Sequence, residues 1–379
     1  MGQRQTPGPH PRNLLLPAQR ALVQGRLDRH PYSLLLSRVH AQAARSNDPT
    51  NHEVSPVQST ARTARAAALL FYLDRLPGSG GKATPFPDDK ARRAMGEKAA
   101  TYLLAMKTTS RAKGALGYIL DIHTAQELHL WADTLDLLLG ADMDVLPGSK
   151  RAAAVQNLAD LAADFYNDFE SYPNWLLMRA LINNHRTKSA AALGLAALTL
   201  NGEVFKAGKS DGRYDPARWL DFAMRYVDMC SRDILTDAEY GNQEGPGYLA
   251  YGGIDLFGFL WAWHNYAGAA SYKVDWSPAA APHYRFHATG AYTVPDMWSA
   301  PWLERQVGWL VRLMLPDGTL PAFDDNSPGG RFFFGALVQP GVASAPLFRW
   351  AWRQSGYTSS GSVDQAPLLL VTFDDAVPE

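Results

Sequence analysis

The stretch LINNHRTKSAAALGLAALTL, residues 181–200, joins a polar cluster to a helix that is apolar on every side. Asn183 or Asn184 suits the N-cap position, and Ala, Gly and Leu fill the turns that follow. A helix that is hydrophobic all round is a buried helix. The stretch therefore predicts an inner helix of a helical protein, with polar side chains gathered at its N-terminal end.

Helical spacing of apolar residues continues along most of the chain. It predicts two short helices within 14–45, broken at His30-Pro31, and further helices over 57–76, 90–106, 124–140, 149–169, 187–200, 216–235, 254–270, 302–315 and 345–356. Strand-like alternation is nearly absent before APLLLVTFDD, residues 366–375. Uniformly apolar helices alternate with amphipathic ones, as in paired inner and outer helices. The predicted fold is all-α, an incomplete α/α toroid of antiparallel helix pairs.

Composition excludes several classes of function. Lys+Arg 36 against Asp+Glu 37 leaves a formal net charge of -1 in 379 residues, so neither nucleic acid nor a membrane surface is an expected partner. The single cysteine, Cys230, excludes an internal disulfide and a cysteine-based zinc site. His123 and His129 are six residues apart, a spacing that does not place them on one helix face, so no metal and no cofactor is expected.

The polar cluster at 183–188 has two interpretations. The free backbone N–H groups at a helix N-terminus attract anions, and His185, Arg186 and Lys188 add donors and positive charge there. Such an end would hold a carboxylate group. The alternative is that the asparagine caps the helix and the histidine satisfies a neighbour.

Two later stretches also carry candidate chemistry. YGNQEGPGYLAYGGIDLFGF, residues 240–259, offers Tyr240, Tyr248 and Tyr251, whose hydroxyls can transfer protons or simply pack in the core. LPDGTLPAFDDNSPGG, residues 315–330, carries Asp324 and Asp325, which can serve a hydrolase or cap a turn. Neither stretch decides between its two interpretations alone.

Four blocks, in order along the chain, resemble the heparinase II/III-like polysaccharide lyase superfamily, which includes alginate, heparin and heparan lyases. They are HPRNLLLPAQRALVQGRLDRHPYSLLLSRV (10–39), NNHRTKSAAALGLAAL (183–198), EGPGYLAYG (244–252) and LPDGTLPAFDD (315–325). The resemblance implies an α/α-toroid catalytic domain over 10–357, followed by an antiparallel β-sandwich domain. We then expect 1–9 to be a disordered or added extension, and 358–379 to be a linker and the first strand of a truncated β-sandwich.

The resemblance further implies a carbon–oxygen lyase that cleaves an acidic, uronate-containing polysaccharide by β-elimination. Asn184 and His185 match the position that neutralises the uronate carboxylate, without which the C5 proton is too weakly acidic to remove. Tyr248 matches the general acid, which in some members is also the base. The expected substrate contacts are Asn183, Arg186, Glu244, Tyr251 and Asp325.

The same resemblance implies a periplasmic or secreted protein, although MGQRQTPGPH lacks a signal-peptide pattern. Several family members take a further His or Tyr from the β-sandwich domain. Two alternatives stay open: an α/α-toroid glycoside hydrolase using carboxylates such as Glu244 and Asp325, and a non-catalytic glycan-binding protein. The sequence specifies neither the polymer nor the oligomeric state.

Overall fold

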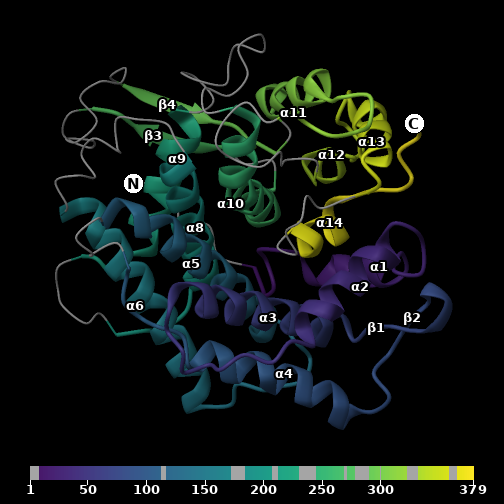
Figure 1. The fold of residues 1–379 in the computed structure, drawn as a ribbon. Coiled ribbons are helices and arrows are strands. Elements are labelled where there is room, and N and C mark those ends of the chain that lie inside the picture. Colours follow the sequence, from purple (N-terminus) through teal and green to yellow (C-terminus); the bar gives the residue numbers. More distant parts are fainter. Residues whose placement is uncertain are drawn as a thin grey trace.

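The computed structural model describes residues 8–111, 117–171, 184–206, 212–229, 245–268, 271–277, 290–298, 300–321, 332–357 and 365–379 (Figure 1). Helix makes up 63% of the structure, which confirms the all-α prediction. The strands in these ranges form two short antiparallel pairs. Leu76–Pro77 (β1) pairs with Ala83–Thr84 (β2), and Tyr272–Asp275 (β3) pairs with Ala291–Val294 (β4), with Tyr272 opposite Val294.

Most helices begin and end close to the positions that the sequence pattern predicts, but α10 begins nine residues and α5 seven residues before the predicted start, so the glycine-rich stretch ahead of 254 is helical and not a loop. In chain order they are η1 (Pro17–Gln19), α1 (Arg20–Gln24), α2 (Tyr32–Ala43), α3 (Val54–Leu73), η2 (Ser79–Gly81), α4 (Asp89–Leu104), α5 (Gly117–Leu139), α6 (Ser149–Ser171), α8 (Asn184–Leu200), α9 (Pro216–Met229), α10 (Gly245–Ala267), α11 (Pro301–Leu313), α12 (Phe332–Ala336), α13 (Ala345–Gln354) and α14 (Ala366–Thr372). Local signals explain several starts. Asp88 caps α4 by accepting a hydrogen bond from the backbone N–H of Ala91 at 2.7 Å, and a proline occupies the first turn of α11, α13 and α14.

Four helices, α3, α5, α8 and α10, lie side by side and run in the same direction. Contacts near the two ends of each neighbouring pair give this direction: Gln58–His123 and Arg65–Asp133 join α3 to α5, Asp121–His185 and Ala132–Thr199 join α5 to α8, and Lys188–Asp255 and Gly194–Phe259 join α8 to α10. Nearly every residue of α8 is buried, as its uniformly apolar sequence predicts. The N-terminal ends of these four helices therefore lie at one end of the molecule.

The helices that follow α3, α5 and α8 in sequence run back along them. Early in α4, the Nε of Arg92 donates to the carbonyl of Phe71 late in α3, at 3.1 Å. Early in α6, Gln156 receives a hydrogen bond from the backbone of Lys206, which lies beyond the end of α8. Late in α9, Tyr226 contacts Thr187 at the start of α8. Three of the four inner helices, α3, α5 and α8, are thus each followed by an antiparallel helix.

The C-terminal helices pack between α10 and the beginning of the chain. Phe333 in α12 stacks on Phe257 in α10 with 4.3 Å between ring centroids, and α12 packs on α14. Beyond α14, the carbonyl of Phe373 accepts a hydrogen bond from the hydroxyl of Tyr32 in α2 at 2.8 Å. Figure 1 shows the yellow α14 beside the purple α1 and α2.

The segment 366–375 is a correction to the predicted strand. It forms α14 where the sequence pattern had indicated the first strand of a β-sandwich. Its run of four apolar residues, Leu368 to Val371, fits a short buried helix as well as a strand, and Pro367 in the first turn favours the helix. Burial against α2 and α12 then selects the helical form.

An extended N-terminal segment, residues 8–16, crosses the C-terminal ends of α5, α8 and α10. The carboxylate of Asp136 in α5 receives three hydrogen bonds from it, from the His10 imidazole at 2.6 Å and from the backbone N–H groups of Arg12 and Asn13 at 2.8 Å each. The Asn13 side chain also donates to the hydroxyl of Thr199 in α8 at 2.8 Å. The segment therefore covers the end of the inner helices opposite to their N-terminal ends.

Within the described ranges, no helix combines the length and the apolar composition that a bilayer crossing requires.

Candidate functional site

The first turn of α8, which carries the predicted residues Asn184 and His185, packs directly against the second turn of α10. A Cβ atom placed on Gly252 would lie 3.2 Å from the Cβ of Thr187 and 3.4 Å from the Cα of Asn184. Tyr248 lies one turn earlier in α10 and is half-buried. The glycine allows the two parallel helices to approach closely, and Tyr248 lies one turn beyond this contact, toward the N-terminal end of α10.

His185 is held by a buried carboxylate that the sequence analysis did not identify. Its Nδ1 lies 2.8 Å from Oδ1 of Asp121 in α5, and the Asp121 side chain is fully buried while that of His185 is 24% exposed. Burial raises the pKa of Asp121, and the hydrogen bond from His185 acts in the opposite direction. A carboxylate partner favours the charged form of an imidazole and orients its ring. Asp121 is therefore a positioning residue for the exposed edge of His185.

Arg186 and Thr187 face the outer helix α9. Arg186 is 1% exposed, and its guanidinium lies over the ring of Tyr226 at 5.9 Å from the ring centroid. Thr187 hydrogen-bonds to the hydroxyl of the same tyrosine. These contacts place the positive charge of Arg186 inside the protein, behind the first turn of α8.

Lys188 lies buried between α8 and α10. Its side chain is fully buried, and its ammonium donates to Oδ2 of Asp255 and, at 3.2 Å, to the backbone carbonyl of Tyr251. The same ammonium lies 4.3 Å from the centroid of the Tyr251 ring, a cation–π contact. Tyr251 thus lies directly against a buried positive charge.

A chain of buried ionic groups continues from Lys188 and Asp255 into the core. His129 in α5 donates from Nδ1 to Oδ1 of Asp255 at 2.6 Å, and its Nε2 lies 3.3 Å from Oδ2 of Asp133. Arg65 in α3 reaches the same Asp133 oxygen at 3.3 Å. Three cations, Lys188, His129 and Arg65, thus face two carboxylates. These five side chains together carry one net positive charge.

The protonation states of this chain follow from its geometry. Burial lowers the pKa of His129, but Asp133 and Asp255 more than offset this and raise it to about 9. Burial raises the pKa of Asp255, but Lys188 and His129 bring it down to about 2. Both carboxylates and the imidazolium are therefore charged at neutral pH.

A second imidazole lies on the α3 side of the same end. Nδ1 of His123 in α5 is 2.9 Å from Nε2 of Gln58 in α3, and His123 is half-buried. Burial and the positive charges of Lys188, Arg111 and His185 lower the pKa of His123. These charges act on His123 because it lies near the α8 cluster. From the sequence alone His123 was weighed only as a metal ligand, and its place near the α8 cluster was not predicted.

Arg111 and Glu127 complete the α3 side. The Nε of Arg111 donates to Oε1 of Glu127 at 2.8 Å, and its backbone N–H donates to the hydroxyl of Thr124 at 2.9 Å. Burial raises the pKa of Glu127 to about 7 in spite of the arginine. Within the described residues, no three His, Cys, Asp or Glu side chains are grouped as ligands of one metal ion.

Three of the predicted substrate contacts, Asn183, Glu244 and Asp325, lie outside the described residues, as does the loop tyrosine Tyr240. The structure describes the others, which lie in the first turn of α8 and the first two turns of α10. Their roles in catalysis stay predictions.

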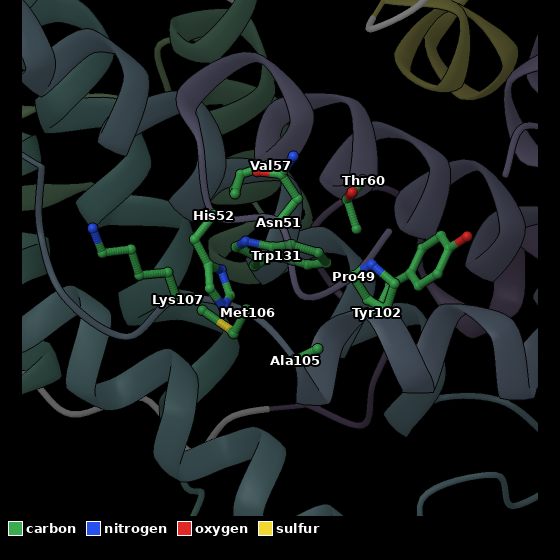
Figure 2. Close-up of a pocket in the computed structure, with 10 residues that line it drawn as sticks. All are labelled: Pro49, Asn51, His52, Val57, Thr60, Tyr102, Ala105, Met106, Lys107 and Trp131. Atoms are coloured by element: carbon green, nitrogen blue, oxygen red, sulfur yellow. The ribbon is translucent and has the colours of Figure 1, made fainter. Parts of the chain in front are cut away.

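A shallow recess lies on the outer side of α3, away from the predicted residues. Figure 2 shows the ring of Trp131 in its centre, with His52 and Lys107 on one side and Tyr102 on the other. Its lining is Pro49, Asn51, His52, Val57, Thr60, Tyr102, Ala105, Met106, Lys107 and Trp131. The recess contains none of the residues that carry the candidate chemistry.

The residues that sequence reasoning missed share one signal. Asp121, Asp133, Asp136 and Asp255 lie in inner helices, and each has a fully or almost fully buried side chain. A buried carboxylate needs donors or a cation beside it. An aspartate in an inner helix therefore predicts an ionic or hydrogen-bonded partner, although the sequence does not say which residue that is.

Compared with models of known protein families the chain matches none, and no curated protein matches its sequence.

Proposed function

We propose that the protein is a polysaccharide lyase of α/α-toroid architecture, which cleaves a uronate-containing glycan by β-elimination. The observation that carries the proposal is the meeting of four parallel helix N-termini with a cationic cluster and a tyrosine turn. Aligned helix dipoles give each N-terminal end a partial positive charge, so four such ends together favour an anion. Lys188 and the net positive buried chain add to this field. An acidic substrate is the matching partner.

The helix arrangement supports the toroid. Four inner helices that run one way, three of them followed by an antiparallel helix, fit a ring of helical hairpins. Side-by-side contacts continue from α3 through α5, α8 and α10 to α12, α14 and α2, and α2 packs on α3. A succession of neighbours that returns to its first member favours a ring over an open stack.

The chemistry of β-elimination assigns roles to the residues at this end. The electron pair of the C5–H bond forms the C4–C5 double bond, the C4–O4 bond breaks, and O4 takes a proton. Charge develops on the uronate carboxylate as C5 loses its proton, and the His185 imidazolium, held by Asp121, and the Asn184 amide stabilise it. Tyr248 delivers the proton to O4. If Tyr248 starts as the phenolate, it first takes this proton from C5. Tyr251, against Lys188, is the neighbouring phenol.

The test is a panel of uronate polysaccharides read by the ultraviolet absorbance of the 4,5-unsaturated product. A hydrolase would release reducing ends without this absorbance, and a binding protein would release neither. The family resemblance also implies a periplasmic or secreted site of action, where such polymers are met.

Two variants connect the activity to the site. Tyr248→Phe should lower turnover by about 10²–10⁴-fold with little change in KM, because it removes the transferred proton and keeps the ring. His185→Ala should cost about 10²-fold or more, the usual loss for one group that stabilises charge in the transition state.

Matched controls lie at the other end of α10. His264 forms a similar pair with Asp296, at 2.7 Å, and Tyr266 hydrogen-bonds to Asn201. His264→Ala and Tyr266→Phe should keep near-wild-type turnover. Full activity in Tyr248→Phe and His185→Ala would remove the proposed site.

A further inference from the structure

Two imidazoles at the N-terminal end of the inner helices have opposite hydrogen-bond partners. Nδ1 of His185 faces the carboxylate of Asp121 at 2.8 Å, and a carboxylate only accepts, so this nitrogen carries a hydrogen. Nδ1 of His123 faces the amide nitrogen of Gln58 at 2.9 Å, and an amide nitrogen only donates. The hydrogen of neutral His123 is therefore on Nε2.

The charges around His123 keep it neutral. Lys188 and His185 on α8 and Arg111 ahead of α5 act on it with positive charge, and together with burial they lower its pKa. Gln58 on α3 contributes no charge, and Glu127, four residues on in α5, is paired with Arg111. A neutral imidazole of this tautomer presents a hydrogen-bond donor at Nε2 and no lone pair there.

We propose that His123 contacts the substrate and donates its Nε2–H to the uronate carboxylate, while Gln58 positions it by fixing the tautomer. This inference rests on the proposed lyase function and adds a neutral donor to the charged donor His185. Both donors strengthen their bonds as negative charge grows on the carboxylate in the transition state. His123 keeps its proton throughout, so the elimination balances without it.

A neutral donor suits this position for an electrostatic reason. A fourth cation beside Lys188, Arg111 and His185 would have to be desolvated against three like charges. An N–H group on a neutral ring stabilises the growing charge without that repulsion.

Substitutions that separate donor, base and structural roles test the proposal. The amide nitrogen of glutamine can occupy the place of Nε2 and donate, but it cannot accept a proton. His123→Gln should therefore keep kcat within about tenfold of wild type, whereas His123→Ala should lose about 10²–10³-fold in kcat with little change in KM. His264→Gln, at the far end of α10, is the matched control and should leave kcat unchanged.

Several results would overturn the inference. Equal loss in His123→Gln and His123→Ala would make His123 a base. Unchanged kcat in both variants would remove it from the reaction, and a loss that follows only a lowered thermal unfolding temperature would make it structural.

A nitrogen-15 NMR spectrum of the histidine side chains gives a readout that does not need turnover. The spectrum of the whole chain should show His123 as the Nε2–H tautomer at neutral pH, and Gln58→Glu should place a hydrogen on Nδ1. An Nδ1–H tautomer in the wild type would overturn the inference even if the protein is an active lyase. A wild type that neither binds nor cleaves any uronate polymer would overturn the proposed function and the substrate contact, while an Nε2–H tautomer that changes to Nδ1–H in Gln58→Glu would still support the role of Gln58.

Discussion

Replacing Asp255 by asparagine removes a carboxylate that lies between two buried cations, Lys188 and His129. Asp255 accepts from the ammonium of Lys188 and from the imidazolium of His129, and its side chain and that of Lys188 are fully buried. Loss of one partner from a buried ion pair costs about 3–5 kcal/mol, because the other charge stays in the core uncompensated. Asp255→Asn affects two such partners, so we expect a loss near the upper end, about 5 kcal/mol of the free energy of unfolding.

Lys188→Met provides the comparison within the same chain of charges. It removes one cation and leaves Asp255 with His129 still beside it, so the expected loss is smaller, about 3 kcal/mol. Combining it with Asp255→Asn should cost less than the sum of the two single losses, because both single changes break the same pair. Asp89→Asn, on the exposed first turn of α4, should change stability by no more than about 0.5 kcal/mol.

Urea unfolding followed by tryptophan fluorescence measures these differences, and the sequence has 11 tryptophans to report them. The reasoning would be refuted by a loss below about 1 kcal/mol for Asp255→Asn. It would equally be refuted if Lys188→Met destabilised the protein more than Asp255→Asn.

Three further predictions concern pH and close packing. The pKa of His129 is raised from 6.5 to about 9, so its charge stabilises the fold fully below about pH 6.5 and this contribution is lost as pH rises through about 9. Urea unfolding at pH 7 and pH 10 should show this fall in the stability of the wild type and a smaller fall in His129→Gln. The pKa of Glu127 is raised by burial from 4.5 to about 7, so stability should decline as pH rises through that interval, and a Glu127→Gln variant that keeps the same decline would contradict this. In Gly194→Ala the new Cβ would lie 2.3 Å from the Phe259 ring, so we expect a loss of about 1–3 kcal/mol by thermal unfolding. Gly308→Ala, where nothing lies within 4 Å, should be neutral or stabilising, and equal effects of the two glycine changes would argue against the tight α8–α10 contact.

The sequence pattern was most informative about helices and least informative about partners. The apolar run at 187–200 predicts an inner helix because a helix that is buried on every side is apolar on every side, whichever elements surround it. The pairing of Asp121 with His185 joins positions 64 residues apart, and nothing in either helix specifies the other. Lys188 and Asp255 likewise find each other only because α8 and α10 run parallel in close contact.

The segment 366–375 shows a different limit. A short apolar run has no periodicity that separates a strand from a buried helix, so tertiary packing decides between them. The polar cluster at 183–188 was recognised from its position, but the burial of Arg186 and Lys188 depends on Tyr226 and Asp255, which the local sequence does not specify.

The N-terminal segment that crosses the ends of α5, α8 and α10 makes the chain suitable for fragment complementation. Without this segment, the carboxylate of Asp136 would lose three hydrogen-bond donors, from His10, Arg12 and Asn13. Gly140, whose lack of a side chain leaves room for Pro11, would become exposed. A synthetic peptide of residues 8–16 supplied to the shortened protein would replace those bonds in trans. The stability of the protein–peptide complex would then rise with peptide concentration by mass action. Unfolding curves measured at several peptide concentrations would therefore give the affinity of the protein for this nine-residue ligand.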